Sequence, residues 1–217
     1  ELKFLPTAGH ELQTRPEASL MRHSELRWIK MMCELGPFSV TFGDLWFEDE
    51  SDGDVEAMLA ALSSCVPELT SLQFIRSEGV AGAAIGQLQH LSLPRLSRLT
   101  HLSVDWAVSL DVTALTALKE LHAAAALAID CRGCIELVHV HAADARVVHC
   151  DGCTKLTRLE CSSAEFLFCS GCPSLTQVDL PLGRVGDFSD CTALVEVYTS
   201  VVEELYLDNT PSLLQLH

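Results

Sequence analysis

Cysteines in three short segments carry the strongest chemical signal in this sequence. The segments are DCRGC at 130–134, HCDGC at 149–153 and FCSGC at 168–172, and each contains a Cys-x-Gly-Cys knuckle. Fifteen residues separate one knuckle from the next. The resulting pattern, C-x2-C-x15-C-x2-C, is typical of a zinc site in which two knuckles supply four thiolates. A zinc-stabilised module is therefore the first hypothesis that these cysteines raise.

A repeat of 19 residues accounts for the same cysteines without a metal. With the second Cys of each knuckle as an anchor, cysteine recurs at Cys134, Cys153, Cys172 and Cys191. A leucine stands three residues after every anchor position, and Leu or Val stands three residues later again. The leucine column is Leu99, Leu118, Leu137, Leu156, Leu175, Leu194 and Leu213. Such a repeat predicts a solenoid whose neighbouring units bury one continuous core.

Each unit also has two inward positions before the anchor, as Leu167 and Cys169 illustrate. Two apolar residues separated by one residue predict a short, half-buried strand. The apolar residues after the anchor, at steps of three, predict a tight return without a strand. The residue just before the anchor is Gly133, Gly152, Gly171, Asp190 or Asn209. These residue types accept a positive φ, so we expect a turn at this point of each unit.

The knuckle positions are not reserved for cysteine. The first-Cys column holds Phe74, Leu93, Val112, Phe188 and Leu207 in other units, and the second holds Ser77, Leu96, Leu115 and Thr210. A buried free cysteine behaves as a small hydrophobe, so these columns favour core cysteines over metal ligands. A further alternative is a bridge between column neighbours such as Cys150 and Cys169 under oxidation, because stacked strands lie within the Cα range of a disulfide.

The stretches LFCSGCPSLTQV (167–178) and LYLDNTPSLLQL (205–216) resemble the leucine-rich repeat family, in the branch that carries Cys where others carry Asn. The resemblance covers residues 37–217 as about nine units, the last one incomplete, and it implies an α/β repeat solenoid with short parallel strands. A unit of 19 residues is shorter than the family's usual 20 to 29. We therefore expect mostly non-helical convex returns, extended or 3₁₀.

The beginning of the chain follows a different pattern. DLWF (44–47), the helical pattern at 54–69 and then Leu72 form a longer step that resembles a repeat of the ribonuclease-inhibitor type. Residues 16–36 have apolar positions three or four apart and end at Gly36, which predicts an amphipathic helix. We expect residues 1–36 to form an N-terminal helical cap, because the end units of a solenoid require a cover.

Histidine is the other residue type that could do chemistry, and HVHAADARVVHC (139–150) holds the densest group. Val140 lies in a core column, so His139 and His141 point away from the core, and we expect them to face solvent or a partner. The sequence contains no G-x-S-x-G, phosphate loop or H-E-x-x-H, and the acids at 47–54 lack the spacing of an EF-hand. We expect no catalytic residue, no bound metal and no cofactor.

Composition narrows the partners and the compartment. A formal charge of −16 argues against direct nucleic-acid binding, which needs Lys and Arg to neutralise phosphates. The longest apolar run, 123–129, is too short to span a bilayer, so we expect no membrane contact. Ten cysteines in 217 residues are fewer than in small disulfide scaffolds. We therefore expect an intracellular, reducing compartment, either the cytoplasm or an organelle matrix.

Outward residues of the predicted strands form the candidate binding face, since solenoids bind partners along such surfaces. Phe166 and Phe168 would stand together in solvent, and interface aromatics are frequent hot spots. Neighbouring acids would favour a partner protein with a basic segment. The candidate partner-binding residues are Phe166, Phe168, His149, Asp130, Asp187, Glu204 and Tyr206.

These observations predict a non-catalytic protein–protein interaction scaffold, a subunit or fragment of a larger assembly. Two alternatives stay open at this point. One is the zinc-stabilised Cys-x-x-Cys module. The other is a targeting arm of an enzyme whose catalytic domain lies outside this chain.

Overall fold

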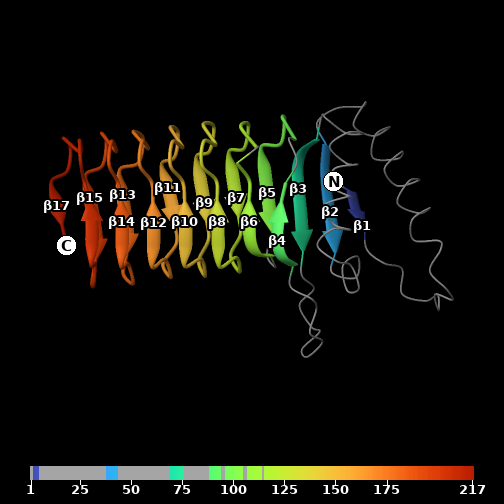
Figure 1. Ribbon diagram of the computed structural model, residues 1–217. Helices are drawn as coiled ribbons and strands as arrows, with labels where there is room; N and C mark the ends of the chain where they lie inside the picture. The colour runs from blue at the N-terminus through green and yellow to red at the C-terminus, as the bar shows by residue number, and fades with distance from the viewer. Residues whose placement is uncertain are drawn as a thin grey trace.

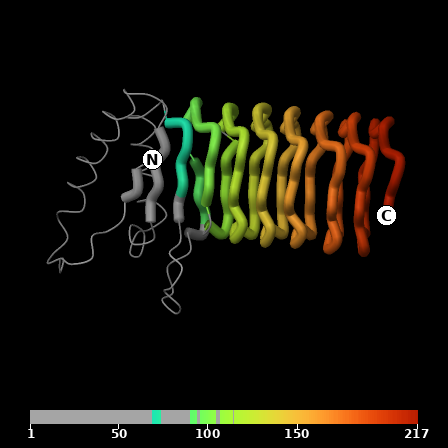
Figure 2. Tube along the Cα trace, turned by 180° about the vertical axis from the view of Figure 1, so that it is seen from behind, coloured from blue at the N-terminus to red at the C-terminus, as the bar shows by residue number. Residues whose placement is uncertain are grey.

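The computed structural model describes residues 2–4, 38–43, 69–75, 88–93, 96–104, 107–113 and 115–217. Within these ranges the chain coils into a parallel β-solenoid. From residue 88 onward, strands of neighbouring turns pair at a spacing of 19 residues, as Val147 does with Phe166, whereas Leu72 pairs with Leu102 at a spacing of 30. Figure 1 shows the strands as two layers that run along one axis, and Figure 2 shows from behind that the turns stack in a single row. The predicted repeat solenoid is confirmed at this level.

Sheet A is the layer formed by the strands that follow the anchor position. It contains β1 (Leu2–Phe4), β2 (Phe38–Gly43), β3 (Leu69–Ile75), β5 (His101–Val104), β7 (Glu120–His122), β9 (His139–His141) and β11 (Arg158–Glu160). The same layer continues as a three-stranded group of β13 (Gln177–Leu180), β15 (Glu196–Thr199) and β17 (Gln215–Leu216).

Sheet B is the opposite layer, formed by the strands that precede the anchor position. It contains β4 (Leu88–Ser92), β6 (Ala107–Asp111), β8 (Ala128–Asp130), β10 (Val147–His149), β12 (Phe166–Phe168), β14 (Val185–Asp187) and β16 (Glu204–Tyr206). Because each complete turn contributes one strand to each sheet, every turn has two outward strand faces.

The prediction of non-strand returns is wrong, since the returns contain the strands of sheet A. Along β7, Glu120 is exposed, Leu121 is buried and His122 is exposed, which is the alternation of a strand. The three-residue step from Leu118 to Leu121 crosses the turn before the strand and conceals this alternation. Pairing with β5 and β9 gives the backbone groups of the return their partners.

The core lies between the two sheets and consists of the predicted columns from Leu91 onward. The prediction for the preceding unit is wrong, since Leu72 and Phe74 pair with Leu102 and Val104 in sheet A and do not continue the columns of sheet B. Ile129, Val148 and Leu167 point inward from sheet B, and Leu121 and Val140 point inward from sheet A. All five are at most 2% exposed. The two layers therefore share one core and cover each other.

The predicted turn after each strand of sheet B is confirmed. Gly133, Gly152 and Gly171 have φ of 72°, 73° and 69°, and Asp190 and Asn209 have φ of 61° and 56°. In this conformation the amide of Gly152 donates to the carbonyl of Ser170 in the next turn at 2.8 Å. The turn residue thus joins adjacent units, and its conformation explains the preference for Gly, Asp and Asn.

Residues 2–4 of the predicted cap form β1, which pairs in parallel with β2. The rest of the cap, including the predicted helix at 16–36, lies outside the described residues, as do DLWF (44–47) and all but the last residue of the helical pattern at 54–69. In the described part of the chain, no helix is long and apolar enough to cross a membrane.

Candidate binding faces of the solenoid

All seven residues of the predicted partner-binding set lie on the outer side of sheet B. Strand pairing aligns Phe166 with Val147 and Val185, and it aligns Phe168 with His149 and Asp187. Two outward columns result, which together form the sheet B face. They are Ala128, Val147, Phe166, Val185 and Glu204 in one column, and Asp130, His149, Phe168, Asp187 and Tyr206 in the other.

The two phenylalanines of this face are half-buried and held by neighbours. The ring of Phe168 stacks on the ring of His149 with centroids 4.7 Å apart and an interplanar angle of 7°. The guanidinium of Arg184 lies 5.8 Å from the centroid of the Phe166 ring. These contacts restrict both aromatic side chains while part of each stays accessible, which is the condition of an interface anchor.

Acidic side chains of the sheet B face are oriented by hydrogen bonds. Arg132 Nη2 lies 2.6 Å from Asp130 Oδ2. Burial raises the pKa of Asp130, but the hydrogen bonds and charge of Arg132 outweigh burial and hold that pKa below its ordinary value. The hydroxyl of Tyr206 donates to Glu204 Oε2 at 2.8 Å, and this bond raises the pKa of Tyr206.

The sheet B face is acidic overall. Three arginines lie at this face, Arg132, Arg146 and Arg184, and each already pairs with an acid, as Arg184 does with Glu203 at 3.0 Å. Six carboxylates lie on the sheet B strands from β6 to β16 or on the residue before one of these strands: Asp111, Asp130, Glu165, Asp187, Glu203 and Glu204. The arginines at the same positions are Arg146 and Arg184. This excess gives the face a negative potential that attracts cationic segments.

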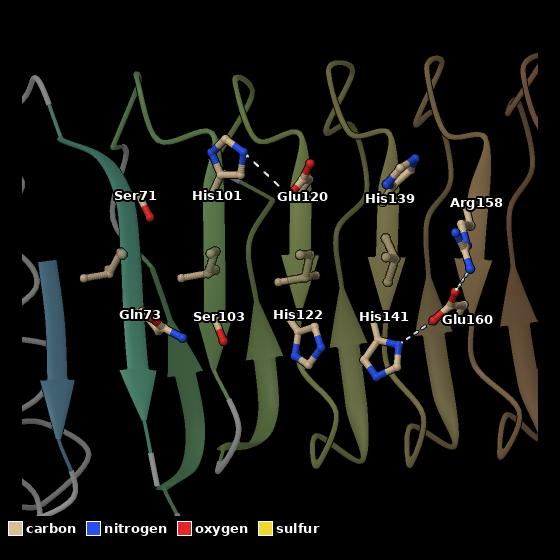
Figure 3. Close-up of a pocket in the computed structure, with 14 residues that line it drawn as sticks. Ser71, Gln73, His101, Ser103, Glu120, His122, His139, His141, Arg158 and Glu160 are labelled. Carbon is tan, nitrogen blue, oxygen red and sulfur yellow. Dashed lines mark hydrogen bonds and ion pairs between the residues drawn. The ribbon is translucent and has the colours of Figure 1, made fainter. Parts of the chain in front are cut away.

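Sheet A carries a shallow hollow of about 490 Å³ on its outer side, which was not predicted from the sequence. Its polar lining comes from β3, β5, β7, β9 and β11, and Figure 3 shows these side chains along the strands. The polar side chains are Ser71, His101, Glu120, His139 and Arg158 in one column, and Gln73, Ser103, His122, His141 and Glu160 in the other. The polar–apolar–polar triplets ELH at 120–122 and HVH at 139–141 were the signal for this face.

Both carboxylates of the hollow have cationic or imidazole partners. His141 Nδ1 lies 2.6 Å from Glu160 Oε2, and Arg158 Nη2 lies 2.6 Å from Glu160 Oε1. The hydrogen bond to His141 and the charge of Arg158 hold the pKa of Glu160 below its ordinary value. At the other end, His101 Nε2 lies 3.6 Å from Glu120 Oε2.

Imidazole rings also contact each other in the hollow. The ring of His122 stacks on that of His141 with centroids 4.3 Å apart and an interplanar angle of 24°. Figure 3 shows these two rings side by side on neighbouring strands. The predicted outward direction of His139 and His141 is confirmed, since Val140 between them is 1% exposed.

The knuckle cysteines lie in the core as free thiols. The thiol of Cys153 donates to the carbonyl of Cys131 in the preceding turn at 3.1 Å. Sulfur atoms of Cys131 and Cys150 lie 3.1 Å apart. The bond to the preceding turn recurs at Cys134, Cys172 and Cys191. Within the described ranges, no three His, Cys, Asp or Glu side chains are placed to hold a metal ion.

Burial raises the pKa of Cys134 and Cys161 to about 12. A thiol with such a pKa stays protonated at neutral pH and keeps its hydrogen as a donor. The knuckle cysteines are all buried, so the structure gives them the role of core side chains, in agreement with the apolar residues that replace them in other turns.

No family model, no curated protein and no solved structure matches this chain. The resemblance to leucine-rich repeats therefore gains no support from a family match.

Proposed function

We propose that this chain is a non-catalytic scaffold that binds a partner protein through the sheet B face, and that the partner contributes a basic segment. The observation that carries the proposal is the pair Phe166 and Phe168, two half-buried aromatics on one three-residue strand. They lie between Asp130 on β8 and Glu204 on β16, so an apolar centre has an acidic rim. Apolar anchors surrounded by polar groups are characteristic of protein interfaces.

The rigidity of this surface supports the same proposal. The stack of Phe168 on His149 and the position of Arg184 over Phe166 restrict the rings before any partner arrives. Less side-chain entropy is then lost on binding. Partner lysines or arginines would meet Asp187, which the strand pairing places beside Phe168, and Glu204, which lies one strand further along the sheet. Electrostatic complementarity of this kind raises association rates and selects partners.

Two finer statements belong to this proposal. We assign the 19-residue unit to the short, irregular leucine-rich repeats on the strength of its Leu and Cys columns, with the second strand as a departure from the expected return. We also assign the protein to a reducing compartment, because ten cysteines in 217 residues are fewer than in disulfide scaffolds and the apolar core needs no bridges.

The experiment is quantitative capture from cell extract with immobilised protein and with the double variant Phe166→Ser, Phe168→Ser. Loss of an interface anchor costs about 2 kcal/mol or more, so we expect a protein enriched by the wild type to lose at least about tenfold in recovery. Circular dichroism and urea unfolding of the variant should match the wild type, since both residues lie on the outer side of the sheet.

A matched control removes apolar surface elsewhere. Ile135 and Leu182 are 49% and 59% exposed and lie outside the strands. The double variant Ile135→Ser, Leu182→Ser should retain capture. Unchanged capture by the phenylalanine variant, or equal loss by the control, contradicts the proposal.

A further inference from the structure

We infer that the hollow on sheet A is a second binding site, for an acidic peptide segment, and that mild acidity switches this site on. The inference goes beyond the proposed function, because it concerns the opposite layer of the solenoid and a partner of the opposite charge.

The charge of the hollow depends on its four imidazoles. With neutral imidazoles, one guanidinium stands against two carboxylates, for a formal charge of −1; with all four protonated, the charge is +3. Free histidine in water changes its charge near pH 6.5, and mild acidity is therefore the pH range in which a cluster of imidazoles is tested for a switch. The ionisable groups that face the hollow are His101 on β5, Glu120 and His122 on β7, His139 and His141 on β9, and Arg158 and Glu160 on β11. The strand β3 contributes only the neutral side chains Ser71 and Gln73. Beyond the hollow, Asp179 on β13 follows Glu160 in the same column.

The carboxylates of the hollow do not neutralise every added charge. Protonated His101 would pair with Glu120, and protonated His141 would share Glu160 with Arg158. His139 is exposed and lies between Glu120 and Arg158 in the first column, so Glu120 stands between two imidazoles, those of His101 and His139. Two carboxylates thus face four imidazolium rings and one guanidinium, and this excess gives the positive potential that an approaching carboxylate meets.

The stack of His122 on His141 couples protonation to anion binding. Two imidazolium rings with centroids 4.3 Å apart repel each other. A carboxylate that approaches both rings reduces this repulsion, and it therefore binds more tightly to the protonated pair. By linkage, the bound carboxylate also favours protonation of the rings.

The dimensions of the hollow suit a peptide. Its lining spans five strands, and neighbouring strands lie about 4.8 Å apart, so the hollow is about 19 Å long. An extended peptide advances about 3.3 Å per residue, so about six residues match this length. Ser103 and Gln73 provide hydroxyl and amide groups along the same path for the backbone of such a peptide.

The test uses a peptide of eight aspartates with a rhodamine label, whose fluorescence does not depend on pH in this range; the peptide stays ionised at both pH values because Asp titrates near pH 3.9. Fluorescence anisotropy at constant ionic strength measures its affinity at pH 7.5 and pH 5.5. We expect about a tenfold gain on acidification, because several exposed ion pairs each contribute little. The double variant His122→Gln, His139→Gln should lose the gain.

The control double variant His90→Gln, His217→Gln removes two histidines outside the hollow and should keep the gain, as should Phe166→Ser, Phe168→Ser. Circular dichroism at both pH values establishes that each variant is folded. Equal affinity at the two pH values overturns the inference, and so does a full gain in the His122, His139 variant. Competition by inorganic phosphate at the same concentration as unlabelled peptide overturns the assignment to a peptide.

Discussion

The outer faces of sheets A and B are built on the same 19-residue repeat, yet they carry different chemistry. Sheet B presents Phe166 and Phe168 within an acidic surround, whereas the hollow of sheet A presents four imidazoles beside two carboxylates. Beneath both faces the inward residues are the same kind, as Leu167 and Leu121 are. Core packing thus constrains one residue of each triplet, and the two outward residues are left to determine what each face binds.

The difference also concerns electrostatics. On the sheet B face, six carboxylates stand beside three arginines and the imidazole of His149, and Arg132 holds the pKa of Asp130 below its ordinary value. The formal charge of this face therefore stays negative whether or not His149 is protonated. The formal charge of the hollow on sheet A changes from −1 to +3 when His101, His122, His139 and His141 are all protonated. One face is a constant surface and the other a conditional one.

The largest expected effect concerns the core that the two sheets share. Leu167 beneath sheet B and Leu121 beneath sheet A are 0% and 2% exposed. Leu167→Ala and Leu121→Ala should each lower the free energy of unfolding by about 2–5 kcal/mol, because each leaves a cavity. Urea unfolding measures this effect. Each variant should weaken binding at both faces near its unfolding midpoint; loss at one face only would mean that the layers unfold independently.

A smaller effect is expected at the turns that follow the strands of sheet B. Gly152 has φ of 73°, and a Cβ there would contact nothing within 4 Å. Gly152→Ala should therefore destabilise through the backbone alone, by about 1–2 kcal/mol. Gly152→Asn is the matched control and should cost less, since Asn209 takes the same conformation in the last turn. Equal unfolding free energies for the two variants would contradict this explanation.

The cysteine columns lie in the core between the two faces. We expect that an apolar residue can replace a column cysteine, and that a metal chelator does not change the stability of the protein. Cys153→Val removes the bond to the carbonyl of Cys131 but keeps an apolar side chain of similar size, so we expect a loss within about 1.5 kcal/mol. EDTA should leave the circular dichroism spectrum and the urea midpoint of the wild type unchanged. Bound zinc at one or more ions per chain, with unfolding on chelation, would instead establish the zinc-stabilised module.

The smallest effects concern one carboxylate on each face. Asp130 and Glu160 have lowered pKa values, so their contribution to stability is present above the ordinary carboxyl range and is lost as the pH falls through the folded pKa. Arg132→Gln should move the pKa of Asp130 upward, and His141→Gln should do the same for Glu160. NMR titration of the side-chain carboxyl carbons measures both. A change at the carboxylate of the opposite face would show unexpected coupling.

Much of the fold could be predicted from the sequence by comparing the residues that occupy the same position in successive repeats. The recurrence of Leu and Cys predicted the repeat length and the core, and the identity of Gly133 or Asn209 predicted a positive φ. The outward direction of Phe166 and Phe168 follows from Leu167 between them. The return strands were not predicted, because a triplet such as Glu120–His122 is too short to show a period of two beside steps of three.

The sequence alone determined which repeat columns of this protein are buried and which turns need a positive φ, because the same residue types recur at the same column in successive units. Tertiary structure alone decided which exposed residues become neighbours. His122 and His141 are 19 residues apart and stack only because β7 and β9 pair in parallel. His149 reaches Phe168 for the same reason. Backbone pairing sets this register, so a binding face exists only once the turns have stacked.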